Sequence, residues 1–256
     1  IHTLMAICQA KSDIYFVLSD FERSRAEGER LLTLARRAGD RQREGMALAG
    51  MGWASSRAHD LDQALSHARQ AIAVAEEVDA PLIQASGHFI RSQVYAVTGR
   101  LDDAWGEVHQ ALTNNRSGDA IDRRLSIWIP GTIKNWQGEY AEASRLLSGA
   151  MRLARQQNLL FPLLYICFTY GVTLTGKGDY DEALVVLQEG LALAEKVGAE
   201  VLRPRLLNSL GWLYMELGDF DRALALNRQG AEGARKRGDP EITANAHAFL
   251  DLGHGY

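Results

Sequence analysis

The chain has 256 residues, of which 46% are hydrophobic and 23% charged, a globular balance that excludes an intrinsically disordered or collagen-like protein. A net charge of −4 gives no electrostatic footprint for direct binding to nucleic acid or to an anionic membrane surface. The two cysteines, Cys8 and Cys167, lie far apart and support neither a disulfide framework nor a cysteine-rich zinc site. We expect both to be buried free thiols in a cytoplasmic protein.

Six segments of similar sequence follow one another along the chain. Their central hydrophobic residues are separated by 40, 40, 39, 40 and 40 positions, and they are Phe21, Leu61, Leu101, Tyr140, Tyr180 and Phe220. A constant period of this length is the signature of a repeat architecture. The sequence predicts six repeats over residues 1–256, starting near 5, 45, 85, 124, 164 and 204, with a partial seventh helix from about 241.

Within each repeat the apolar residues are spaced three and four positions apart, which predicts amphipathic helices. The pattern is clearest over residues 61–78, 180–197 and 220–235. We expect two antiparallel helices per repeat and no strands. A hairpin of this kind cannot bury its apolar face alone, so neighbouring hairpins must stack.

Small residues recur at fixed offsets from the central hydrophobic residue. Nine positions before it stand Ser12, Gly52, Ser92, Gly131, Gly171 and Gly211. Three positions after it stand Ser24, Ala64, Ala104, Ala143, Ala183 and Ala223. Since small residues let two helix axes approach closely, we expect both sets to lie in helix–helix contacts.

The prolines agree with these boundaries. Four of them fall between the second helix of one repeat and the first helix of the next, where a missing N–H costs little: Pro81, Pro162, Pro204 and Pro240. Pro130 lies inside a predicted first helix, so we expect a kink or a break there. The preceding segment, residues 114–121, is the most loop-like part of the chain.

These residues resemble the tetratricopeptide repeat (TPR) family. The sixth repeat carries the family's spaced small and large residues at Leu207, Leu210, Gly211, Tyr214, Phe220, Ala223 and Gly230. The fifth repeat carries them at Tyr170, Gly171, Leu174, Tyr180, Ala183, Leu187 and Gly190. The resemblance implies an all-α fold, a single right-handed α-solenoid of stacked antiparallel helical hairpins.

Two departures from the family pattern stand out. The period is 40 residues where the family's usual period is 34, which resembles the extended TPR subtype. That subtype is similar to the sensor arms of bacterial signal-transduction ATPases and LuxR-like regulators, and to GoLoco-binding adaptors. In addition, Lys11, Arg91 and Pro130 stand where the family prefers leucine, so we expect the first, third and fourth repeats to pack less regularly.

Motifs for catalysis, metals or cofactors are missing from the sequence. The seven histidines form no HExxH motif and no pair at i and i+4. The segment TGKGDY lacks the glycine spacing and the following Ser or Thr of a phosphate-binding loop. We therefore predict a protein that is not an enzyme and has no catalytic residue, metal site or cofactor.

The resemblance implies that the first helix of each repeat lines a concave face. The predicted groove positions on these helices are Trp53, Phe89, Gln93, Trp128, Thr132, Asn135, Tyr165, Phe168, Arg205, Asn208 and Trp212. Large aromatic side chains on such a face are common binding anchors. The alternative is that some of them pack between neighbouring first helices, as we expect for the helix-packing residues Trp105 and Trp136.

We expect a protein- or peptide-binding scaffold that is a fragment of a larger signalling or regulatory protein. The partner would be a segment of another protein or of the parent chain. The alternative is a small-molecule-sensing arm of a signal-transduction ATPase or transcription regulator. Neither reading involves direct contact with nucleic acid or a membrane, and self-association through the ends of the solenoid stays open.

Overall fold

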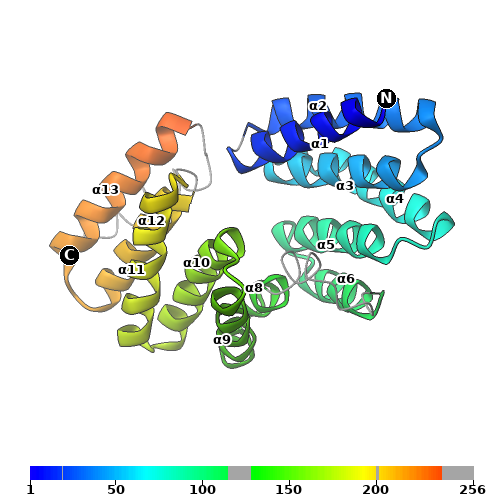
Figure 1. Ribbon diagram of the computed structural model, residues 1–256. Helices are drawn as coiled ribbons and strands as arrows, with labels where there is room; N and C mark the ends of the chain where they lie inside the picture. The colour runs from blue at the N-terminus through cyan, green and yellow to red at the C-terminus, as the bar shows by residue number, and fades with distance from the viewer. Residues whose placement is uncertain (19, 115–127, 200–201, 238–256) are drawn as a thin grey trace. The chain divides into compact units, whose positions relative to one another are not determined.

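The computed structural model describes the chain except for residues 19, 115–127, 200–201 and 238–256. Every regular element among the described residues is an α-helix, twelve in all (Figure 1). The all-α class predicted from the sequence is therefore confirmed. The chain consists of two compact units, Ile1–Ile129 and Pro130–Tyr256. The continuity of all six repeats in one solenoid stays a prediction.

The N-terminal unit contains three helical hairpins. They are formed by α1 (His2–Val17) with α2 (Phe21–Ala38), α3 (Arg41–Arg57) with α4 (Leu61–Glu77), and α5 (Pro81–Val97) with α6 (Leu101–Asn114). Each helix packs against the next one along the chain, and the first helices α1, α3 and α5 also pack against one another in that order. This is the arrangement expected of stacked repeats.

The C-terminal unit continues the same pattern. Its helices are α8 (Ile129–Trp136), α9 (Tyr140–Gln156), α10 (Leu160–Lys177), α11 (Tyr180–Val197), α12 (Leu202–Glu216) and α13 (Phe220–Arg237). From α9 to α13 each helix packs against the next, and the first helices α10 and α12 also touch. Because α8 begins at Ile129, Pro130 occupies its first turn. Of the predicted loop over 114–121, Asn114 is the last residue of α6 and residues 115–121 lie outside the described residues, as does the partial seventh helix.

Capping side chains and left-handed turn residues determine where the helices begin and end. The side chains of Asp20, Asp40 and Asp60 accept the backbone N–H of the residue three positions on, at 3.1, 3.0 and 3.3 Å, and so cap α2, α3 and α4. The turn between the two helices of a repeat takes a left-handed residue at His59, Gly99, Gly138, Gly178 and Gly218. Glycine adopts this conformation without a steric cost.

The recurring small residues are the helix–helix contacts predicted from the sequence. All six positions of each set are buried. A Cβ added to Gly171 in α10 would lie 2.4 Å from Cγ of Leu187 in α11, and one added to Gly131 in α8 would lie 2.4 Å from Cγ of Leu147 in α9. The glycines therefore let the two helices of a repeat approach each other.

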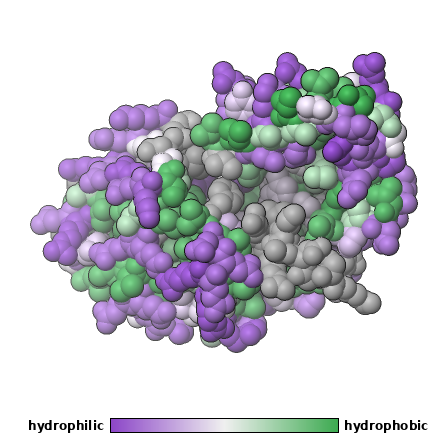
Figure 2. All heavy atoms as spheres, in the orientation of Figure 1, coloured by the Kyte–Doolittle hydropathy of each residue, from purple (hydrophilic) through white to green (hydrophobic). Residues whose placement is uncertain are grey.

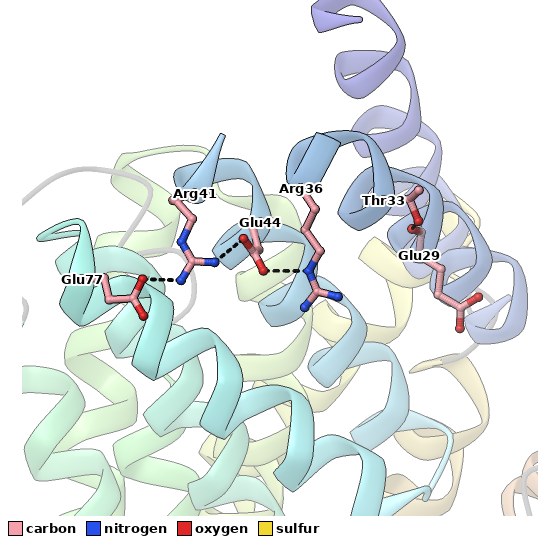
Figure 3. A network of polar contacts seen from close by, with 6 residues as sticks. All are labelled: Glu29, Thr33, Arg36, Arg41, Glu44 and Glu77. Carbon is pink, nitrogen blue, oxygen red and sulfur yellow. Dashed lines mark hydrogen bonds and ion pairs between the residues drawn. The ribbon is translucent and has the colours of Figure 1, made fainter. Parts of the chain in front are cut away.

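A network of ion pairs joins three consecutive helices of the N-terminal unit (Figure 3). At its centre, the buried carboxylate of Glu44 in α3 accepts hydrogen bonds from Arg36 of α2 at 2.8 Å and from Arg41 at 2.5 Å. Arg41 also pairs with Glu77 of α4. Burial alone would raise the pKa of Glu44, but the two guanidinium groups outweigh it and hold the pKa below its ordinary value.

Both cysteines are buried free thiols, as predicted. Burial raises the pKa of Cys167 to about 12, so this thiol is protonated at neutral pH. Among the described residues, no helix combines the length and the apolar character that crossing a membrane requires.

Candidate binding surface

In the N-terminal unit the predicted surface residues lie on α3 and α5, two first helices that pack side by side. Trp53 of α3 is half-buried, and its indole N–H donates to the hydroxyl of Ser86 on α5 at 2.9 Å. This bond orients the indole across the junction of the two helices. Trp53 also packs against the buried cluster of Ala64, Ala68, Ile90 and Val94, but it is not fully covered, so it can serve as a binding anchor.

Two other predicted residues of this unit are deeper. Phe89 is 1% exposed and Gln93 is buried, both on α5. Within the part of the chain that the structure describes, the Nε2 atom of Gln93 has no hydrogen-bond partner. Phe89 therefore contributes to packing rather than to a surface.

A buried polar cluster holds α5 on its partner helix α6. The Nδ1 atom of His88 lies 2.7 Å from Glu107 Oε2, and Arg91 pairs with Glu107 Oε1 at 2.7 Å. A single carboxylate thus satisfies two buried or half-buried groups of α5. We assign this cluster to packing within the third repeat.

The predicted residues of the fourth repeat are buried. Trp128, which directly precedes α8, and Thr132 and Asn135 within α8 are all covered. The hydroxyl of Thr173 on α10 donates to Asn135 Oδ1 at 2.8 Å, which joins the first helices of the fourth and fifth repeats. On α10, Tyr165 is buried and Phe168 is half-buried.

In the sixth repeat, two of the three predicted residues are partly accessible to solvent. Asn208 of α12 is buried and donates to Asn227 Oδ1 of α13 at 2.8 Å, so it joins the two helices of its own repeat. Arg205 and Trp212 are half-buried. The indole N–H of Trp212 donates to Glu216 one helical turn further on, at 2.9 Å.

The accessible part of the predicted set is therefore small. It consists of the half-buried residues Trp53, Phe168, Arg205 and Trp212, which we call the first-helix set. Sequence reasoning missed Met46 of α3, which is exposed and occupies the same repeat position as Arg205. Aligning the repeats is sufficient to find it.

The two tryptophans expected to pack between helices differ. Trp105 of α6 is half-buried with its ring edge-on to the ring of His109, at a centroid distance of 5.2 Å. Trp136, at the end of α8, is 42% exposed, so the expectation of a packing role is wrong for this residue.

Stacked two-helix hairpins with small residues at their contacts define a helical repeat protein of the α-solenoid class. Residues 164–236, which span the fifth and sixth repeats, match the family model described as "Tetratricopeptide repeat". The resemblance predicted from the sequence is confirmed by this match and by the fold.

Solved structures show the same fold along the whole chain. A Rap protein complexed with competence and sporulation factor is 15% identical, with a TM-score of 0.71 over 98% of this chain and 75% of that one. NprR in complex with its cognate peptide NprX is 16% identical, with a TM-score of 0.67 over 98% and 73%. Aspartyl phosphate phosphatase F from Bacillus subtilis is 12% identical, with a TM-score of 0.62 over 99% and 70%.

At this level of identity the likeness establishes the fold alone. A comparison with curated proteins gives no match. Arguments about function therefore rest on the side chains of this chain.

Proposed function

We propose that the chain is a non-catalytic scaffold of a signalling or regulatory protein, and that each of its two units binds a peptide or protein segment through its own members of the first-helix set. The observation that carries this proposal is the placement of accessible aromatic and cationic side chains on first helices: Trp53 on α3, Phe168 on α10, and Arg205 and Trp212 on α12. Two proteins of the same fold, the Rap protein and NprR, are each described in complex with a peptide or factor.

The chemistry of the set indicates what such a segment would contain. The indole N–H groups of Trp53 and Trp212 already donate to Ser86 and Glu216. Their rings therefore offer apolar contact rather than further hydrogen bonds. Aromatic rings supply large contact areas at a low cost in side-chain entropy. We expect apolar or aromatic side chains in the partner.

The experiment is selection of binding peptides from a random displayed library on the full chain, followed by calorimetry with the selected peptides. Replacing Trp53 and Trp212 with alanine should weaken binding at least about tenfold, the size expected for removal of hot-spot residues. The matched control is Trp105→Ala, which removes a half-buried tryptophan from the second helix α6. Equal binding by the two variants would refute the assignment of the surface.

The non-catalytic part of the proposal has its own test, because one structure of the same fold bears the name of a phosphatase. The full chain is added at stoichiometric amounts to a protein carrying an aspartyl phosphate. We expect no acceleration of phosphate release. Acceleration would show that this chain is an enzyme.

A further inference from the structure

The first helix of the second repeat, α3, has one accessible face. Along it lie Gln42, Met46, Gly50, Trp53 and Arg57, spaced three or four positions apart, and the other residues from 44 to 55 are buried. We call these five residues the α3 face. Because α3 packs against both α1 and α5, it has a neighbouring first helix before and after it in the chain. The exposure of this face therefore does not come from a missing repeat.

The middle of the α3 face is a recess. Gly50 is half-buried, and a Cβ added to it would meet nothing within 4 Å. Counted from the central hydrophobic residue of each repeat, its equivalents in the third to sixth repeats all carry a side chain and are 5% exposed or less: Ile90, Ile129, Thr169 and Ser209. The second repeat thus lacks a side chain that four other repeats bury.

Ile90 shows what such a side chain fills. Its Cδ1 atom would lie 3.0 Å from a Cβ added to Gly52 of the preceding first helix, α3. Ile90 also belongs to the buried cluster against which Trp53 packs. A side chain at this position therefore fills the junction between its own first helix and the preceding one. Gly50 supplies no such filling at the junction of α3 with α1.

Two uncharged side chains of α3 border the recess, one helical turn away on either side. Met46 stands four positions before Gly50 and is 41% exposed, and its flexible thioether adapts to an apolar guest. Trp53 stands three positions after Gly50, and its bond to Ser86 directs the indole toward α5. The space over Gly50 therefore stays open between them.

The polar residues of the α3 face lie at its two ends. Gln42 and Arg57 are eight and seven positions from Gly50. An apolar centre with a polar rim is the usual composition of a binding interface. Figure 2 shows hydrophobic residues, in green, among hydrophilic ones, in purple, at the surface of the N-terminal unit, where Figure 1 draws α1 and α2. An uncharged guest suits the centre of the α3 face.

The neighbouring helix α1 offers the alternative, a cationic guest. Asp13 occupies the repeat position of Trp53, and its carboxylate accepts a hydrogen bond from Gln9 at 2.8 Å. The equivalents of Gly50 argue against this alternative, since the third to sixth repeats fill the position with isoleucine, threonine or serine and never with a charge. The carboxylate also has a partner within its own helix.

We propose that the recess over Gly50 receives an aliphatic side chain of the segment that the N-terminal unit binds, a side chain of the size of isoleucine. This inference rests on the proposed function and deepens it. Trp53 anchors the segment, Met46 and Trp53 border the guest, and the missing side chain of Gly50 determines which residue fits. Gly50 is thus a specificity-determining residue of this unit.

The first experiment compares displayed libraries of short random peptides whose central residue is fixed as isoleucine, phenylalanine or lysine. Each library is selected on the full chain and counter-selected on the Trp53→Ala chain, which leaves the peptides that depend on Trp53. We expect the isoleucine library to be enriched at least about tenfold over the other two, as burial of one aliphatic side chain allows.

The second experiment fills the recess from the chain itself. Gly50→Ile places there the side chain that the third and fourth repeats carry. Calorimetry with a peptide from the isoleucine library should show binding at least about tenfold weaker. The urea midpoint should not fall, because the added Cβ meets nothing within 4 Å and glycine is the weaker helix former.

The matched control is Gly106→Ile on the second helix α6 of the same unit. A Cβ added to Gly106 also meets nothing within 4 Å, and this glycine is exposed. The control should leave both the binding and the urea midpoint of the chain close to those of the unaltered protein. Equal losses of binding in Gly50→Ile and Gly106→Ile would overturn the proposal.

Failure of this inference differs from failure of the proposed function. If Trp53→Ala weakens binding and Gly50→Ile does not, the N-terminal unit binds a segment without using the recess. If neither substitution weakens binding, or no library yields a binder, both proposals fail. Stronger enrichment of the phenylalanine library, or of a lysine library whose binding Asp13→Asn abolishes, would also overturn the aliphatic guest.

Discussion

The two units differ in the side chains that form one recurring contact. In the fourth and fifth repeats, in the C-terminal unit, a glycine of the first helix faces a leucine of the second, as Gly171 does with Leu187. In the first repeat, in the N-terminal unit, the equivalent of Gly171 is Ser12. Its hydroxyl donates to the backbone carbonyl of Ser24, whose hydroxyl donates back to the carbonyl of Ser12, both at 3.0 Å. One repeat position thus serves two kinds of packing.

The repeat period determines the spacing of the helices. It does not determine which side chains hold them together. The family model matches residues 164–236, inside the unit that uses glycine–leucine contacts. The N-terminal unit contains, in addition, the ion-pair network around the buried Glu44 (Figure 3). Three substitutions test this difference.

The largest effect is expected from Gly171→Ala. Its new Cβ would lie 2.4 Å from Leu187, so the helices must separate or the leucine must leave its rotamer. Overpacking of this kind costs about 3 kcal/mol of the free energy of unfolding. Urea denaturation measures it, with Gly149→Ala as the control, because an added Cβ there meets nothing within 4 Å. A helix-interior glycine in open space gains about 0.5–1 kcal/mol on becoming alanine, and equal shifts in both variants would contradict the account.

The next effect concerns Glu44→Gln, which removes the charge that Arg36 and Arg41 share. We expect a loss of about 2 kcal/mol in the free energy of unfolding at neutral pH, as for hydrogen bonds to charged groups. The pKa of Glu44 is lowered in the folded chain. The ionised Glu44 therefore stabilises the fold at pH values above the pKa that this carboxyl has in the unfolded state. The stabilisation is lost as the pH falls through the lower pKa that it has in the folded state.

Urea midpoints measured from neutral to acidic pH check this prediction. The difference between the unaltered chain and Glu44→Gln should shrink as the pH falls below the ordinary glutamate range. A difference that stays constant with pH would show that the network does not act through the charge of Glu44.

The smallest effect is expected from Ser12→Ala. This variant keeps the Cβ and removes one hydroxyl of the pair with Ser24, so we expect a loss of about 1 kcal/mol. Compared with Gly171→Ala, the same repeat position should respond less in the N-terminal unit. Thermal unfolding of the Ser12→Ala and Gly171→Ala variants measures both losses of stability. A larger loss in Ser12→Ala than in Gly171→Ala would contradict the prediction.

The fold could be predicted from the sequence because its features recur in several repeats, so that each repeat supports the prediction made from the others. The small residues illustrate this: Ser12, Gly52 and Gly171 share one offset and are all buried. The surface is harder to predict, since exposure depends on side chains of other repeats, which the pattern within one repeat does not specify. Phe89 and Phe168 occupy equivalent repeat positions, yet only Phe168 keeps an accessible part.

The exposure of Trp136 escaped prediction as well. The repeat pattern predicts first helices of similar length, but α8 has only 8 residues and Trp136 lies at its end, 42% exposed.

The most direct test of the central claim is photo-crosslinking of a library-selected peptide. Benzoylphenylalanine is placed in the full chain instead of Phe168 on the first helix α10, and separately instead of Val185 on the second helix α11. Binding at the first-helix set predicts a covalent adduct of chain and peptide from position 168 and none from position 185. An adduct from position 185 alone would contradict the account.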